Sequence, residues 1–476
     1  MKKTIARIVC FIFLLLVVLN TVNRIFKVKY GDGIYGLTKF YELEDNTVDV
    51  LVLGSSHAFE NFNTGVLWDK YGMASYVLAG SIQPMWNTYY YLKEALKTQR
   101  PELIVLEGYL TTYQEAYSDD SRIIKNNYGL KWSGDKIKSL MVSAPRERWG
   151  EFMLEYVQYH NRYTEISSED FLADKGRTLY KDWKGFGCNM ATKELEPPDI
   201  VQITDQAPLD RKTESYYRKI IELAGENNIP IIIIIAPYGG ITEKEQKLYN
   251  TAGKIAEEYG AEFINYNLCY QDAGIEFATD AADEAHLNYR GNQKFSEAVG
   301  RHLKEKYRIS DRRGNSLYQS WENNADYIRE QIKNQELAET NDMAGFLKQA
   351  ENENYSYFIS IDGNCHSGME EIKEIMDVFQ ISTDMHRGIW YVDTDGTTWY
   401  SGGQTAERYV KLDGHDICMR RWSDESGTAY INTLLVDNKE YKKVTDGINI
   451  TVYSKVTQMI VDSVGFDAED SFRIVR

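Results

Sequence analysis

The sequence VDVLVLGSSH at residues 48–57 decides the fold class of the first part of the chain. It is a short, continuous apolar run that ends at a glycine followed by small polar residues. Runs of this form are typical of strands in parallel sheets, which are buried on both faces. The residues after such a strand lie at the carboxyl edge of the sheet, where α/β proteins place functional groups. Residues 48–57 therefore predict both a strand and the position of a candidate site.

Four further apolar runs of strand length follow within the first 310 residues, separated by amphipathic helical segments. Strands alternating with helices of this length predict an α/β domain in which helices cover both faces of a parallel sheet. The alternation stops between residues 111 and 208, which predicts a largely helical insertion. This insertion can form a cap over the site or a peripheral subdomain, and the sequence leaves both open. The predicted strands are residues 76–79, 103–106, 229–235 and 262–265, and the predicted helices are residues 86–98, 212–223, 242–258 and 289–307.

The pattern changes after residue 310. A polar helical stretch is followed, from residue 355 onward, by short β-like runs with turn residues between them, at 357–361, 388–392 and 448–453. These runs predict a second, β-rich domain. A chain of 476 residues is also longer than the ~250–300 residues at which a single hydrophobic core stops growing. The predicted organisation is an N-terminal segment 1–30, an α/β domain 31–309 with the insertion 111–208, a helical linker 310–345 and a β-rich domain 346–476.

The N-terminal segment predicts a membrane anchor. Lys2, Lys3 and Arg7 precede an apolar run at residues 8–19, and no small-x-small cleavage site follows it. Positive charge flanking a membrane helix stays in the cytoplasm, so the rest of the chain is expected outside the cell. We therefore expect a single-pass protein of the cell membrane whose bulk is extracytoplasmic. A cleaved signal peptide and a buried core helix are the alternatives.

The composition excludes several classes of function. The 71 acidic and 54 basic residues give a net charge of −17, which disfavours nucleic acid because phosphate backbones bind basic surfaces. The five cysteines form no CxxC pair and no histidine lies at metal-finger spacing from them, so structural zinc is not expected. Asp280, Asp283, Glu284 and His286 are close in sequence, but their spacing matches no standard metal motif. We expect neither a metal nor a cofactor.

Two short motifs together predict nucleophilic catalysis. Ser56 lies at the carboxyl end of the first strand, where backbone N–H groups of the same turn can stabilise an oxyanion. Asp283 precedes His286 by three residues, so its carboxylate can fold back and hold the imidazole as a general base. Taken alone, each motif is also explained by residues that cap a helix or that are polar because they lie at the surface. The combination predicts a catalytic triad of Ser56, His286 and Asp283.

Over about residues 48–307 these motifs resemble the SGNH/GDSL hydrolase family. Residues 54–56, Gly-Ser-Ser, resemble the first block of the family, Gly-Asp-Ser, and residues 283–291 resemble its last block, Asp-x-x-His before the final helix. The resemblance implies a flavodoxin-like parallel sheet sandwiched by helices, the SGNH fold. It also implies that Ser56 is the nucleophile and that Gly80, after the second strand, donates its N–H to the oxyanion.

One block of the family pattern is incomplete. The third block of the family carries an Asn that completes the oxyanion hole, and residues 106–110, Leu-Glu-Gly-Tyr-Leu, have none. Loss of one such donor typically slows catalysis ~10²–10³-fold. Asn87 or the Ser56 N–H can substitute for it. His57 cannot readily act as the base for Ser56, because the side chains of adjacent residues diverge, so it is a packing or substrate-facing group. Trp86 is a second substrate-binding candidate.

The Gly-Ser-Ser form and the anchor also resemble extracytoplasmic proteins of cell-wall D-alanylation and polysaccharide O-acetylation, which work beside a membrane-bound O-acyltransferase. The resemblance implies a serine esterase or O-acyltransferase that acts, through an acyl-enzyme, on acyl esters of a cell-surface polysaccharide or teichoic-acid-like polymer. The alternative is a catalytically degenerate SGNH scaffold with a carbohydrate-binding C-terminal domain. The missing third-block Asn favours the scaffold, whereas the Ser, His and Asp favour the enzyme.

The C-terminal domain has a resemblance of its own. The sequences DGINITVY at residues 446–453 and VDSVGFD at residues 461–467 resemble the closing motif of interleukin-like EMT inducer (FAM3-type) domains. The resemblance implies a compact β-sandwich, and some relatives recognise sugars. The four aromatic residues Trp390, Tyr391, Trp399 and Tyr400 then either form a stacking surface or belong to the core of the sandwich.

Overall fold

The computed structural model divides the chain into two compact units. The first comprises Met1–Ala325 and the second Asp326–Arg476, so the boundary falls within helix α15 (Gln319–Ala338). This helix lies inside the segment 310–345 that the sequence predicts to be a helical linker. The two units are described separately. The described residues are 2–26, 32–153, 155–164, 166, 170, 183–362, 369–379, 381, 388–396, 398–402, 405–423 and 430–476.

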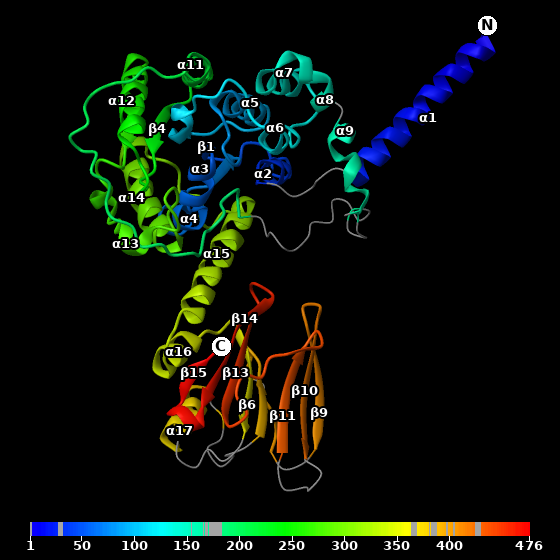
Figure 1. Ribbon diagram of the computed structural model, residues 1–476, viewed down its shortest axis with the longest axis vertical. Helices are drawn as coiled ribbons and strands as arrows, with labels where there is room; N and C mark the ends of the chain where they lie inside the picture. The colour runs from blue at the N-terminus through cyan, green and yellow to red at the C-terminus, as the bar shows by residue number, and fades with distance from the viewer. Residues whose placement is uncertain are drawn as a thin grey trace. The chain divides into compact units, whose positions relative to one another are not determined.

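A parallel sheet of five strands forms the centre of the first unit, in the order β2-β1-β3-β4-β5 (Figure 1). Every residue of β1 to β4 is buried, as the continuous apolar runs in the sequence predict. The prediction of a parallel α/β domain is therefore confirmed. The strands are β1 (Val50–Gly54), β2 (Ser75–Ala79), β3 (Leu103–Glu107), β4 (Ile231–Ile235) and β5 (Glu262–Asn265).

Helices cover both faces of the sheet, because successive strand residues point to opposite sides. Val50 and Val52 of β1 belong to one core cluster, and Leu51 and Leu53 belong to the other. The first cluster includes side chains of α3 (Ser56–Asn61), α4 (Thr64–Tyr71), α13 (Phe277–Asp280) and α14 (Tyr289–Tyr307). The second cluster includes side chains of α2 (Asp32–Phe40), α5 (Met85–Ala95), α11 (Arg211–Glu226) and α12 (Glu243–Glu258).

The carboxyl ends of the strands meet at one edge of the sheet. Gly54, the last residue of β1, pairs with Ala79 of β2, and Leu53 pairs with Leu106 of β3. The residues that follow these strands therefore lie side by side. This edge brings together the sequences after Gly54, after Ala79 and after Leu106.

The described residues of the insertion form short helices and, from residue 183, an extended segment. The segment 183–210 contains no helix or strand and is held by backbone hydrogen bonds to β2, to α3 and to the loop before α14. These bonds join Lys184 to Val77, Gly187 to Phe59, and Lys193 to Ala281. The helices are η1 (Tyr109–Thr112), α6 (Asp120–Asn127), α7 (Gly134–Ser143), η2 (Arg146–Arg148), α8 (Trp149–Met153), α9 (Glu155–Tyr159) and η3 (His160–Thr164), and η4 (Tyr270–Ala273) lies after β5.

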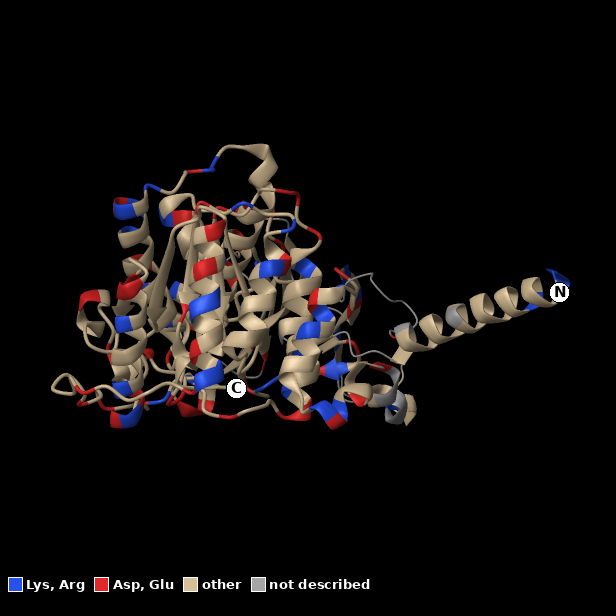
Figure 2. Ribbon diagram, turned by 90° about the horizontal axis from the view of Figure 1, so that it is seen from above, with Lys and Arg blue, Asp and Glu red and all other residues tan. Residues whose placement is uncertain are grey.

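Helix α1 (Lys2–Phe26) is long and apolar enough to cross a membrane. Its apolar side chains are exposed, with Phe11 and Phe13 each 65% exposed. In Figure 2 the blue, basic residues of the helix lie at its start. The length and composition of α1 are those of a membrane span, and a signal sequence has the same properties.

The second unit contains two antiparallel sheets, so the prediction of a separate β-rich C-terminal region is confirmed. The larger sheet has the order β15-β14-β13-β6-β7-β8 and the smaller sheet β12-β11-β10-β9. The strands are β6 (Tyr355–Asp362), β7 (Gly388–Val392), β8 (Thr398–Ser401), β9 (Ala406–Leu412), β10 (His415–Ser423), β11 (Tyr430–Val436), β12 (Lys439–Glu440), β13 (Gly447–Ser454), β14 (Met459–Asp467) and β15 (Arg473–Val475), with helices η5 (Ser316–Tyr318), α16 (Met343–Ala350), α17 (Met369–Val378) and η6 (Ala468–Asp470) in the chain around them.

Two hydrophobic clusters fill the second unit. One joins the larger sheet to α16 and α17, and the other joins it to the smaller sheet. Trp390 and Tyr391 of β7 are buried in these clusters, and Trp399 and Tyr400 are half-buried against them. The four aromatic residues therefore belong to the core and its margin, and the stacking surface that the sequence offered as one possibility is wrong for Trp390 and Tyr391.

Candidate active site

Ser56 is the first residue of α3, immediately past the end of β1. The turn between strand and helix depends on Gly54, whose φ of +156° is unfavourable for other residues. A Cβ atom at Gly54 would lie 2.8 Å from the Cβ of Glu107 and 3.0 Å from the Cβ of Ala58. Glycine at this position therefore lets α3 begin directly against the sheet and places Ser56 at its carboxyl edge.

His286 lies on a tight loop before α14. Ala281 and Leu287 form an isolated β-bridge that closes the loop, and the Ala282 N–H donates to the His286 carbonyl. Asn61, at the end of α3, accepts a 3.0 Å hydrogen bond from the Leu287 N–H. The loop is thus tied to the helix that carries Ser56.

The three residues of the predicted triad are in hydrogen-bond contact. His286 Nε2 lies 2.9 Å from Ser56 Oγ, and His286 Nδ1 lies 3.0 and 3.1 Å from the two carboxylate oxygens of Asp283. Because a carboxylate only accepts, Nδ1 carries the proton and Nε2 accepts the hydroxyl proton of Ser56. The geometry is that of a serine nucleophile, a general base and a carboxylate that orients the base.

Asp283 is fixed by its own loop and stays ionised. Its Oδ1 accepts the N–H groups of Ala285 and His286 at 2.7 and 2.9 Å. Burial alone would raise the pKa of Asp283, but the hydrogen bonds from the His286 ring and from the two N–H groups lower it below its usual value. An ionised Asp283 can stabilise a positive charge on the His286 ring.

A second carboxylate lies beside His286. Glu60 Oε2 is 3.8 Å from His286 Nδ1 and also accepts a 3.3 Å hydrogen bond from the Asn189 side chain. The sequence analysis did not single out Glu60. The signal was present, since Glu60 lies four residues after Ser56 on α3 and therefore on the same helix face.

His57 is fully buried and lies next to the His286 ring. Its ring stacks on Tyr109 with centroids 3.6 Å apart, meets Tyr238 edge-on at 5.0 Å and lies 5.1 Å from the His286 ring. Burial lowers the pKa of His57 well below its ordinary value, and His286 adds to this shift. The ring is therefore neutral, and of the two roles that the sequence left open the structure favours packing over substrate contact.

The third strand, β3, ends at the buried carboxyl group of Glu107, close to the position of the Asn in the family's third block. Glu107 is fully buried, and its Oε1 accepts the Tyr109 N–H at 3.1 Å. Burial raises the pKa of Glu107 to about 8, although backbone N–H groups of Tyr109 and Ala236 act in the opposite direction. Glu107 is thus largely protonated at neutral pH.

Two of the predicted site residues lie elsewhere. Trp86 is fully buried in the core cluster of α5, 3.7 Å from the Lys212 Nζ, so it presents no surface to a substrate. The side-chain amide of Asn87 donates to Asn127, Ser139 and Ser143. Its N–H groups are therefore committed to the insertion, and the predictions of substrate contact for Trp86 and of an oxyanion donor for Asn87 are wrong.

Gly80 follows β2, whose last residue pairs with Gly54. A Cβ at Gly80 would lie 2.2 Å from Asn126 Oδ1, so glycine lets α6 approach here. Within the described part of the chain, neither the Gly80 N–H nor the Ser56 N–H donates a hydrogen bond. Both remain available as donors.

The extended segment of the insertion borders the site. Asn189 bonds Glu60, and Thr192 Oγ1 accepts the Asn288 side chain at 3.1 Å. Lys193 donates its backbone N–H to Ala281 and forms an ion pair with Glu284. Residues 188–193 therefore lie along the His286 loop, and the choice between a cap and a peripheral subdomain for the insertion as a whole stays a prediction.

Among the described residues, no group of three or more His, Cys, Asp or Glu side chains is arranged to hold a metal ion. Asp280, one of the four acidic and His residues weighed above, is fully buried and pairs with Lys294 at 2.7 Å. Its role is to anchor the start of α14.

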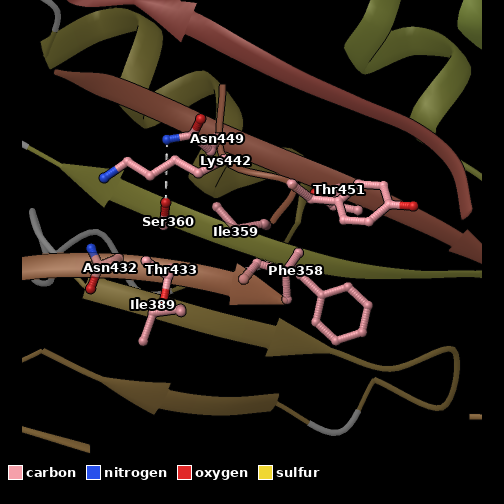
Figure 3. Close-up of a pocket in the computed structure, with 11 residues that line it drawn as sticks. Phe358, Ile359, Ser360, Ile389, Asn432, Thr433, Lys442, Asn449 and Thr451 are labelled. Atoms are coloured by element: carbon pink, nitrogen blue, oxygen red, sulfur yellow. Dashed lines mark hydrogen bonds between the residues drawn. The ribbon is translucent and has the colours of Figure 1, made fainter. Parts of the chain in front are cut away.

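A second group of buried polar side chains lies in the second unit, where Asp362 ends β6. Asp362 Oδ1 lies 3.1 Å from the Lys442 Nζ, and its two oxygens also accept the side-chain N–H groups of Asn432 and Asn449. Ser360, Asn432, Lys442 and Asn449 also line a small cavity of this unit (Figure 3). The cavity that they line is ≈ 10 Å³, which leaves room for at most about one water molecule. The group is a packed part of the domain.

No protein-family model matches the chain, and no curated protein matches it either.

Proposed function

We propose that this protein is an SGNH-type serine enzyme that cleaves or transfers acyl esters. The observation that supports this most directly is the contact of Ser56 Oγ with His286 Nε2, together with that of His286 Nδ1 with Asp283. The triad stands at the carboxyl edge of a parallel sheet whose order, β2-β1-β3-β4-β5, is that of flavodoxin-like folds. Fold and site together support the family resemblance of the sequence.

In the proposed reaction Ser56 Oγ attacks the acyl carbonyl carbon while its proton moves to His286 Nε2. The tetrahedral intermediate collapses, the C–O bond to the alcohol breaks, and the leaving oxygen takes the proton from Nε2. Water or a sugar hydroxyl then attacks the acyl-enzyme and gives its proton to Nε2, which returns it to Ser56. Water yields hydrolysis and a sugar hydroxyl yields transfer.

Two backbone groups are the oxyanion donors of this proposal. The N–H groups of Ser56 and Gly80 lie at the same sheet edge and donate to no acceptor in the described chain. Two N–H donors form a working oxyanion hole in other serine enzymes. Asn87 does not replace the family's third-block Asn in this hole, since its side-chain amide bonds the insertion.

The substrate and the location follow from the resemblance. We propose a single-pass protein of the cell membrane, held by α1, with its bulk outside the cell. The substrate class is then an acylated cell-surface polysaccharide or teichoic-acid-like polymer, and the partner is a membrane-bound O-acyltransferase. The length and apolar composition of α1 support the anchor.

The experiment that tests the proposal uses the full chain in detergent. We expect a fluorophosphonate probe to label the protein and p-nitrophenyl acetate to be hydrolysed. Ser56→Ala is expected to lower both rates by at least ~10³-fold, because the nucleophile is lost. The matched control is Ser75→Ala, a buried serine at the opposite edge of the same sheet, which is expected to keep both rates.

The second candidate function is a catalytically degenerate scaffold that assists polymer modification. One observation favours it, the Glu107 carboxyl group near the position where the family has its oxyanion Asn. A folded protein that the probe labels no faster than Ser56→Ala would support the scaffold.

A further inference from the structure

The imidazole of His286 faces two carboxylates, and the serine mechanism described above uses only one. Asp283 comes from the same loop as His286, whereas Glu60 comes from α3, one helical turn beyond Ser56. Ser56 and the neutral His57, both also on α3, lie against the ring as well. In the part of the chain that the structure describes, Glu60 and Asp283 are the two carboxylates within 4.0 Å of the ring nitrogens.

The two carboxylates differ in their exposure. The side chain of Asp283 is 41% exposed and that of Glu60 is 18% exposed. Water screens the charge of an exposed carboxylate and competes for its hydrogen bonds. Asp283 has the shorter contact with Nδ1, but Glu60 has the better shielded charge.

Glu60 is also held in place from the other side. Asn189 of the extended segment donates to Glu60 Oε2, the same oxygen that lies 3.8 Å from His286 Nδ1. A movement of about 1 Å would bring this oxygen within hydrogen-bond distance of the Nδ1–H. The side chain is thus poised beside the imidazole.

We propose that Glu60 is a positioning residue that shares with Asp283 the task of holding and stabilising His286. This inference rests on the proposed serine mechanism. When His286 takes the Ser56 proton, both ring nitrogens carry hydrogen and the ring gains one positive charge. Neither carboxylate takes a proton in this step, and their combined charge stabilises the imidazolium. Without Asp283, Glu60 becomes the acceptor for the Nδ1–H.

A double-mutant cycle on the full chain in detergent tests this. The variants are Glu60→Gln, Asp283→Ala and the combination, and the measurement is the second-order rate of fluorophosphonate labelling at Ser56. Asp283→Ala alone is expected to lower the rate ~10²–10⁴-fold. Glu60→Gln alone is expected to lower it about 2–5-fold, but at least about 10-fold in the Asp283→Ala background, because the two carboxylates substitute for each other.

The pH profile of labelling separates positioning from a merely structural role. A carboxylate beside the ring favours the protonated imidazole, which is inactive as a base. Removal of Glu60 is therefore expected to move the pH of half-maximal labelling to a lower value. Glu284→Gln is the matched control, since Glu284 adjoins Asp283 but pairs with Lys193 and does not contact the ring. It is expected to change neither the rate nor the pH of half-maximal labelling.

The outcomes separate a failure of the role inferred for Glu60 from a failure of the proposed serine mechanism. Labelling that survives Ser56→Ala overturns the proposed function and the inference with it. Labelling that depends on Ser56, with additive effects and an unchanged pH profile, overturns the inference alone. If Glu60→Gln does not fold, Asn189→Ala removes a hydrogen bond to Glu60 Oε2 and is expected to shift the pH profile in the same direction.

Discussion

The carboxyl edge of the parallel sheet and the polar group around Asp362 both bury polar side chains, but they differ in how completely these are paired. The two oxygens of Asp362 accept hydrogen bonds from Ser360, Asn432 and Asn449 and pair with Lys442. At the sheet edge, at least four buried atoms find no partner among the described residues. These atoms are Ser55 Oγ, His57 Nδ1, His57 Nε2 and Glu107 Oε2.

The difference separates a structural cluster from a candidate site. A buried polar group without a partner costs ~1–3 kcal/mol, so a domain core avoids it and an active site tolerates it. The groups at the sheet edge surround Ser56 and His286, whereas those around Asp362 line a cavity too small for a substrate. The unpaired groups beside the sheet edge are consistent with the site proposed there for the first unit.

The largest effect that can break this comparison is expected from Asp362→Ala. The substitution leaves the nearly buried Lys442 ammonium without its partner and is expected to destabilise the second unit by ~3–5 kcal/mol. Hydrogen exchange of the amides of β6 and β13 measures this, and labelling of Ser56 is expected to stay unchanged. The control is Asp416→Ala, which breaks the exposed pair with Lys411 and is expected to leave exchange unchanged. A loss of Ser56 labelling in Asp362→Ala would show that the cluster is more than structural.

The sheet and the triad could be predicted from the sequence because each rests on local patterns. The run VLVLG and the five isoleucines of β4 are short apolar runs of the kind typical of buried parallel strands. Ser56 and the Asp283–His286 pair are each defined within a few residues, and a strand end and a loop before a helix meet at the carboxyl edge of any such sheet. Only the folded structure shows that Ser56 Oγ and His286 Nε2 lie 2.9 Å apart.

The residues around the triad could not be predicted, since long-range packing decides their direction. Asn87 follows the second strand by only a few residues, yet its amide bonds Ser139 and Ser143, more than fifty residues away. Trp86 is an aromatic residue near the site in sequence, but α5 turns it into the core. No local pattern distinguishes these orientations from the ones that the sequence analysis assumed.

The second prediction concerns Glu107, one of the buried groups at the sheet edge, and the pH dependence of the protein's stability. Because burial raises the pKa of Glu107 to about 8, its stabilising contribution is complete below the ordinary pKa of a Glu carboxyl and is lost as the pH rises through about 8. Glu107→Gln has no such loss. Its stability relative to the unsubstituted protein is expected to rise by ~2 kcal/mol between pH 6 and pH 8, measured by urea denaturation.

A matched carboxylate gives the control for this pH effect. Asp280 is equally buried but has Lys294 as a partner, so Asp280→Asn is expected to destabilise the protein at both pH values. If Glu107→Gln is less stable than the unsubstituted protein at pH 8, Glu107 has a charged partner in solution, and the contrast between paired and unpaired clusters fails at that residue.

The smallest expected effect concerns a fully paired group of buried side chains in the first unit, around Asn87. The side-chain amide of Asn87 and its partners Asn127, Ser139 and Ser143 form a buried, mutually bonded group like that around Asp362. Asn87→Ala is expected to cost about 1–2 kcal/mol of stability, because it removes the donors for three acceptors. Labelling of Ser56 is expected to change less than about 2-fold, since Asn87 is no oxyanion donor. A fall in labelling of ~10² or more, the size expected for a lost oxyanion donor, would restore the role that the sequence assigned to Asn87.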